Sequence, residues 1–165
     1  MKDGLHYNAD KELSVIRRWI IFFIVALAVS GITAFALETE LKWLVNILPA
    51  RGNLYDWISK VYEALKDINT RYPFLAYGYD WLAFAHLVIA VAFIGPMIDP
   101  VRNKWVIVFG MIAYVMIFPS AFIAAEVSSI PFYWKLIDCS FGIIGLIPLL
   151  ICYKKIQKLE KHVSA

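Results

Sequence analysis

Four long apolar stretches constrain the fold of this chain more than any other feature. They cover residues 19–37, 81–98, 105–125 and 132–153. Each is close to the roughly 20 residues that an α-helix needs to cross the hydrocarbon core of a bilayer. Because lipid offers no hydrogen-bond partners to the backbone, each stretch has to form a helix if it crosses. The sequence therefore predicts an all-α integral membrane protein with four transmembrane helices.

The overall composition supports membrane residence. Hydrophobic residues make up 61% of the chain and charged residues 18%, whereas soluble domains have about 45–50% and about 25%. The chain contains neither a Gly/Pro/Ser linker nor a solenoid-type repeat, so we expect a single domain over residues 1–165. The net charge of +3 is modest and comes from basic clusters at the ends of the spans, so nucleic-acid binding is not expected.

The first apolar stretch has two readings. Residues 34–36 have the small-x-small form of a signal-peptide cleavage site. However, the apolar run over residues 19–37 is longer than the usual hydrophobic region of a signal peptide. We therefore expect it to be retained as the first transmembrane helix.

The long connection over residues 38–79 predicts one further helix. Residues 41–48 are apolar but too short to span, and a second helix is expected over about residues 54–68. Asn53 is its expected N-cap residue, with Asp56 three residues on in a capping-box-like arrangement. Its apolar residues recur at helical spacing: Leu54, Trp57, Ile58, Val61, Leu65 and Ile68. An amphipathic helix that cannot span should lie in the membrane interface, as a cap on the bundle or as a lid over a site.

The distribution of lysine and arginine predicts the orientation. Basic residues near the span ends gather on one side: Lys2, Lys11, Arg17, Arg18, Arg102, Lys104, Lys154, Lys155, Lys158 and Lys161. The other side carries Lys42, Arg51, Lys60, Lys66, Arg71 and Lys135. Both termini, including a basic tail over residues 154–165, are therefore expected in the cytoplasm, with the spans in the cell (inner) membrane. The four helices then form an up-down bundle, and the amphipathic helix lies in the first outward-facing loop.

Residues 77–86, at the start of the second span, carry several side chains that could serve a site. We expect an aromatic turn hinged on Gly78, with the span beginning at Trp81. His86 then lies about 7–8 Å deeper than Trp81. An ionisable residue inside a span is costly and by default marks a functional site. The candidate ligand contacts at this end are Asp80, Tyr77, Tyr79, Trp81 and Glu38.

The predicted topology places other polar residues at the same outward end. Glu126 ends the third span, and Lys135 and Asp138 lie in the first turns of the fourth. A hydrogen bond from His86 to Glu126 or Asp80 could move a proton, so His86, Glu126, Asp138 and Lys135 form the candidate catalytic set. The alternative is structural. Lys135 and Asp138, three residues apart, would form an interfacial salt bridge, and His86 would bond to a neighbouring helix.

Small residues indicate the faces through which the spans pack. The expected stripes are Ala26, Ser30 and Thr33 on the first span, Ala83, His86 and Ala90 on the second, and Asp138, Gly142, Gly145 and Leu149 on the fourth. Cys139 and Cys152 are roughly 20 Å apart along one helix, so we expect packed thiols rather than a disulfide.

No cofactor is predicted. The sequence contains no H-E-x-x-H motif, no Cys pair with metal-ligand spacing, no phosphate-binding glycine loop and no nucleophile elbow. The residue types leave one alternative, a single zinc or iron ion held by His86 together with carboxylates.

Three function classes follow from these features. We favour a polytopic membrane protein whose outward His/carboxylate site binds or moves a small solute, ion or lipid. The first alternative is a membrane-embedded enzyme that acts on a lipid-like substrate by acid-base or metal chemistry. The second is an accessory subunit of a membrane complex, since aromatic residues on the outer side suit an interface. Membrane lipids are expected partners, together with further copies of the chain or a larger membrane complex.

Overall fold

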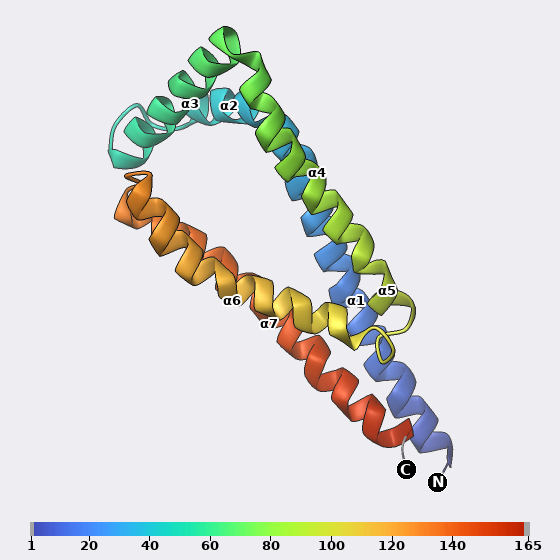
Figure 1. Cartoon of the computed structure of the whole chain (residues 1–165). Coiled ribbons are helices and arrows are strands. Elements are labelled where there is room, and N and C mark those ends of the chain that lie inside the picture. Colours follow the sequence, from blue (N-terminus) through green and yellow to red (C-terminus); the bar gives the residue numbers. More distant parts are fainter. Residues whose placement is uncertain (1, 164–165) are drawn as a thin grey trace. The chain divides into compact units, whose positions relative to one another are not determined.

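The computed structural model describes the backbone of residues 2–163 and the side chains of residues 10–161 (Figure 1). The chain is 89% helical, and the described part contains no strand. Within it, four helical stretches are long and apolar enough to cross a membrane: Asp10–Phe35, Pro73–Ile98, Lys104–Val127 and Phe132–Lys161. The predicted all-α chain with four helices of membrane-crossing length and polarity is confirmed.

The helices form two compact units. In chain order they are α1 (Lys2–Phe35), α2 (Leu37–Ile47), α3 (Asn53–Arg71), the 3-10 helix η1 (Pro73–Leu75), α4 (Ala76–Ala92), α5 (Ile94–Ile98), α6 (Lys104–Val127) and α7 (Phe132–Val163). The first unit contains residues 2–25 and 91–163, and the second unit contains residues 26–90. Each unit is described by itself.

In the first unit, α6 and α7 pack side by side (Figure 1). Two glycines of α7 allow the close approach, because a Cβ on Gly145 would lie 2.0 Å from the Tyr114 ring and one on Gly142 would lie 3.4 Å from Phe118. Leu149, further along the same stripe, is 1% exposed. The predicted packing face of the fourth span is thus confirmed for these three residues. Cys139 and Cys152 are buried free thiols, as expected.

Two helices extend beyond the predicted spans. The prediction ended the fourth span at residue 153, whereas α7 continues to Val163, and α1 begins at Lys2 instead of residue 19. Lysine and glutamate are good helix formers, so the helices continue beyond the apolar stretches. Ion pairs hold these extensions: Glu12 of α1 pairs with Lys155 of α7, and Lys104 at the start of α6 pairs with Glu160 of α7 at 2.6 Å.

The second span also differs from the prediction. The aromatic turn expected around Gly78 is wrong, because α4 begins at Ala76 and includes that glycine. Pro73 starts η1 just before it, in a first-turn position that proline favours. The helix is interrupted between α4 and α5 because Pro96 has no N–H to donate to the carbonyl of Ala92.

In the second unit, α2 and α3 contact each other, and Leu41 and Ile58 are buried there. The predicted second helix of the long connection therefore exists as α3. Its N-cap residue is Gly52 rather than Asn53. Gly52 has a φ of 105°, a conformation that glycine adopts without strain, and its carbonyl accepts the backbone N–H of Asp56 at 3.1 Å.

Candidate functional site

An aromatic pocket with one carboxylate lies in the second unit. It has a volume of about 320 Å³ and is lined by Phe35, Tyr77, Asp80, Trp81 and Phe84. Phe35 ends α1, and the other four residues follow one another on one face of α4. The fold thus gathers three of the predicted ligand contacts into one pocket. We call this the aromatic pocket.

The rings of the aromatic pocket support one another. The centroids of Tyr77 and Trp81 are 5.8 Å apart at an interplanar angle of 85°, and those of Trp81 and Phe84 are 5.7 Å apart at 89°. Edge-to-face pairs of this kind are favourable beyond the area that they bury. Asp80 is half-buried beside them. Among the described side chains, no lysine, arginine or histidine forms an ion pair with its carboxylate.

A hydrogen-bonded chain joins three helices of the second unit. Asn69 of α3 donates from Nδ2 to Oε2 of Glu38 at 2.8 Å, and the Tyr79 hydroxyl donates to Oδ1 of Asn69 at 2.9 Å. Glu38 and Tyr79, two predicted ligand contacts, are therefore held by Asn69 and do not line the aromatic pocket. Sequence reasoning missed Asn69 because a single asparagine on an amphipathic helix belongs to no motif.

His86 is half-buried on the face of α4 that packs against α1. Its Nδ1 lies 2.8 Å from the carbonyl oxygen of Leu82. A carbonyl only accepts, so Nδ1 carries the proton, and Nε2 keeps its lone pair in the neutral ring. This hydrogen bond lies within α4. The structural alternative, in which His86 bonds to a neighbouring helix, is therefore not what is observed for Nδ1. The predicted bond to Asp80 is not formed, because residues six apart lie on different faces of a helix.

The contact between α1 and α4 centres on Gly31. A Cβ on Gly31 would lie 2.9 Å from the carbonyl oxygen of Ala83 and 3.1 Å from Cβ of His86. The predicted packing face of the second span is therefore correct at Ala83 and His86. On the first span the contacting residue is Gly31, which the predicted stripe through Ser30 missed by one position.

In the first unit, Lys135 pairs with Glu126. The Lys135 Nζ donates to Oε2 of Glu126 at 2.7 Å, and the two side chains are 9% and 82% exposed. The salt bridge between Lys135 and Asp138 that the structural alternative expects is not formed, because Lys135 pairs with Glu126. Helical side chains point toward the N-terminus of their own helix, so Lys135 reaches back to the end of α6, while Asp138 lies about one turn further along α7.

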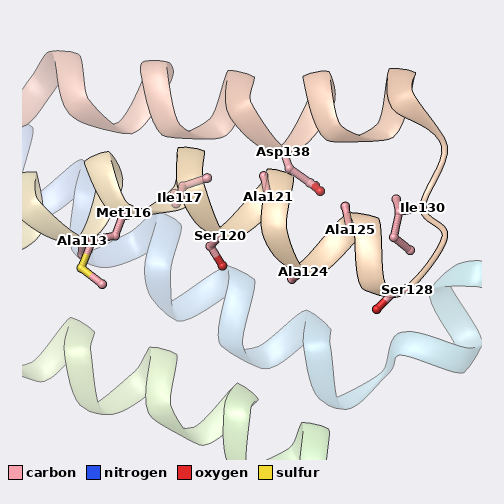
Figure 2. A pocket seen from close by; sticks show the side chains of 10 residues that line it. All are labelled: Ala113, Met116, Ile117, Ser120, Ala121, Ala124, Ala125, Ser128, Ile130 and Asp138. Carbon is pink, nitrogen blue, oxygen red and sulfur yellow. The ribbon is translucent and has the colours of Figure 1, made fainter.

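Asp138 lies instead in a groove along α6, which we call the α6 groove. Its volume is about 530 Å³, and its lining residues are Ala113, Met116, Ile117, Ser120, Ala121, Ala124, Ala125, Ser128, Ile130 and Asp138. Figure 2 shows the Asp138 side chain reaching from α7 toward α6. Its carboxylate is half-buried and has no hydrogen-bond or ion-pair partner within residues 10–161.

The candidate residues therefore fall into two groups. Glu38, Tyr77, Tyr79, Asp80, Trp81 and His86 belong to the second unit, and Glu126, Lys135 and Asp138 to the first. A mouth shared by both groups stays a prediction. In the described part of the chain, no three His, Cys, Asp or Glu side chains gather to hold a metal ion. No protein-family model, curated protein or solved structure matches this chain.

Proposed function

We propose that this chain is an integral membrane protein that binds a quaternary ammonium group in the aromatic pocket. The observation that carries the proposal is the half-buried Asp80 carboxylate, which lies beside aromatic rings and has no cationic partner among the described side chains. A cation over an aromatic face gains about 0.5–1 kcal/mol at exposed sites and about 2 kcal/mol or more when desolvated. The carboxylate adds an attraction that strengthens as the local dielectric falls.

A quaternary ammonium group fits this pocket better than a primary amine or a metal ion. It has no N–H donors that require several oxygen acceptors, and Asp80 is the one carboxylate that lines the pocket. Its methyl groups contact aromatic rings favourably, as in the aromatic cages that recognise choline. The group can come from a choline-bearing lipid or from a soluble cation.

The proposal includes a topology in which the four spans alternate in direction. Both termini then lie in the cytoplasm and the aromatic pocket at the outer face of the cell membrane. The support is the set of ten lysines and arginines near the span ends on the terminal side. In this arrangement α3 lies in the membrane interface. The bonds of Asn69 to Glu38 and Tyr79 favour a fixed cap over a mobile lid.

Binding is favoured over transport by the polarity of the spans. A pathway for a charged solute needs polar groups along its whole length, since charge in hydrocarbon is costly. The cytoplasmic halves of the apolar stretches contain no lysine, arginine, aspartate or glutamate. The pocket is therefore proposed to close at its inner end.

The test uses the full chain in nanodiscs made of phosphatidylglycerol, which lacks choline. Phosphatidylcholine is added at increasing fractions, and tetramethylammonium is titrated separately; native mass spectrometry and calorimetry measure the binding. We expect Asp80→Asn to weaken binding about tenfold, or about 1.4 kcal/mol. Asp67→Asn is the control, because Asp67 is an exposed carboxylate that pairs with Arg71 on α3.

Each outcome decides a different point. Binding of phosphatidylcholine alone identifies the lipid as the source, whereas equal binding of tetramethylammonium identifies a soluble cation. If the Asp80 and Asp67 variants bind alike, or if the chain does not prefer choline over glycerol headgroups, the pocket is only an aromatic membrane anchor and the proposal is wrong.

A further inference from the structure

The α6 groove contains a charge that the proposed function does not use. Asp138 lies about 9 Å along the axis of α7 from Phe132, inside an apolar stretch. A charged residue inside a span is costly unless it finds a partner. The nearest basic residue on α7 is Lys135, which is engaged with Glu126. The Asp138 carboxylate is thus left in an apolar groove without a partner among the described residues.

The shape of the α6 groove suits a helix. Its lining positions recur at helical spacing from Ala113 on α6 to Ser128, the C-cap residue of α6, over about 22 Å along the axis. Most of them are small: Ala113, Ser120, Ala121, Ala124, Ala125 and Ser128. Small residues let the backbone of another membrane helix approach closely. A groove of this length and polarity fits a transmembrane segment better than a compact solute.

The negative charge of Asp138 indicates which side chain a helix in the α6 groove would carry. In the outer halves of the described spans, Lys135 is the one lysine or arginine, and it is paired. A second copy of the chain could therefore bring no free lysine or arginine to the depth of Asp138. Ionisable residues inside membranes pair with one another, and an unpaired buried charge costs more than a paired one.

From these observations we propose that the α6 groove docks a transmembrane helix of a different protein, which carries a lysine or arginine at the depth of Asp138. The small residues of α6 provide the close contact, and Asp138 provides the counter-ion that selects a basic helix. This assigns the groove a role that is independent of the aromatic pocket, and failure of one site leaves the other untouched.

The test measures energy transfer in lipid vesicles between the labelled full chain and a labelled synthetic transmembrane peptide. The peptide is rich in leucine and alanine and has one lysine at the depth of Asp138; a matched peptide has leucine at that position. We expect the lysine peptide to bind about tenfold more tightly than the leucine peptide. Asp138→Asn should remove this preference.

A second pair of variants tests the groove itself. Ala121→Phe fills the groove and should weaken the binding of both peptides. Ile123→Phe is the matched control, because Ile123 is 69% exposed and does not line the groove. It should leave binding unchanged.

Three results would overturn the proposal. The first is equal binding of the two peptides, or an unchanged preference in the Asp138 variant. The second is a loss of thermal stability in the isolated Asp138→Asn chain without any peptide effect, which would mean that Asp138 is satisfied inside the chain. The third is energy transfer between labelled copies of the chain that Asp138→Asn abolishes, which would make the occupant a second copy.

Discussion

Lys135 lies 2.7 Å from Glu126, across the turn that joins α6 to α7. The pair is asymmetric, because the lysine side chain is 9% exposed and the glutamate side chain is 82% exposed. The ion pair closes the α6–α7 hairpin. Lys135 lies three residues before Asp138, so spacing alone would allow those two to pair, but Lys135 is bound to Glu126 instead. The Asp138 carboxylate therefore has no ion pair with Lys135.

The asymmetry of this pair predicts unequal effects of removing its members. Glu126→Ala leaves the largely buried Lys135 side chain without its counter-ion and should destabilise the chain more than removal of the lysine does. Lys135→Met leaves only an exposed carboxylate and should cost less than about 1 kcal/mol. Thermal unfolding in detergent measures both, and the double variant should resemble Lys135→Met. Equal losses from the two single variants would contradict this account.

Two glycines of the second unit should respond in opposite directions to alanine. A Cβ on Gly31 would lie 2.9 Å from the Ala83 carbonyl oxygen, which is backbone and cannot rotate away. Gly31→Ala should therefore destabilise the chain by about 1 kcal/mol or more. Nothing lies within 4 Å of a Cβ on Gly78, so Gly78→Ala should be neutral or stabilise by up to about 1 kcal/mol. Unfolding in detergent compares them, and similar shifts would show that α1 and α4 do not meet at Gly31.

Asn69 should hold α3 in place. Asn69→Ala removes the bonds to Glu38 and Tyr79 and should speed amide hydrogen exchange over residues 53–71 about tenfold or more. Thr70→Ala is the control, because the Thr70 hydroxyl bonds only within α3, to Lys66. If both variants exchange alike, α3 is held by apolar contacts alone.

His86→Ala should fold like the parent chain. Alanine keeps the Cβ that faces Gly31, and the lost hydrogen bond runs only to Leu82 of the same helix. We expect a change in stability within about 1 kcal/mol. Cation binding should persist, since His86 does not line the aromatic pocket. Calorimetry on the folded variant checks this, and a loss of binding would place the imidazole in the site.

The helices were predictable because their causes are local. The length of an apolar run decides whether a segment can span, and the spacing of apolar residues identified α3. The ends were predicted less well, as at α4 and α7. The prediction took the end of the apolar run as the end of the helix, whereas helix formers and ion pairs extend the helix into water.

The sequence by itself determined four helices long and apolar enough to cross a membrane, an amphipathic α3 and a concentration of aromatic and acidic residues at the start of the second span. Tertiary structure alone decided how these residues are used. It paired Lys135 with Glu126, linked Glu38 to Tyr79 through Asn69, and placed Asp80 with three rings of α4 and Phe35 of α1. Hydrogen bonds and ion pairs extend only about 3–4 Å, so they depend on helix register and on where each chain turn ends. The spacing of apolar residues specifies neither the helix register nor the point at which a turn ends.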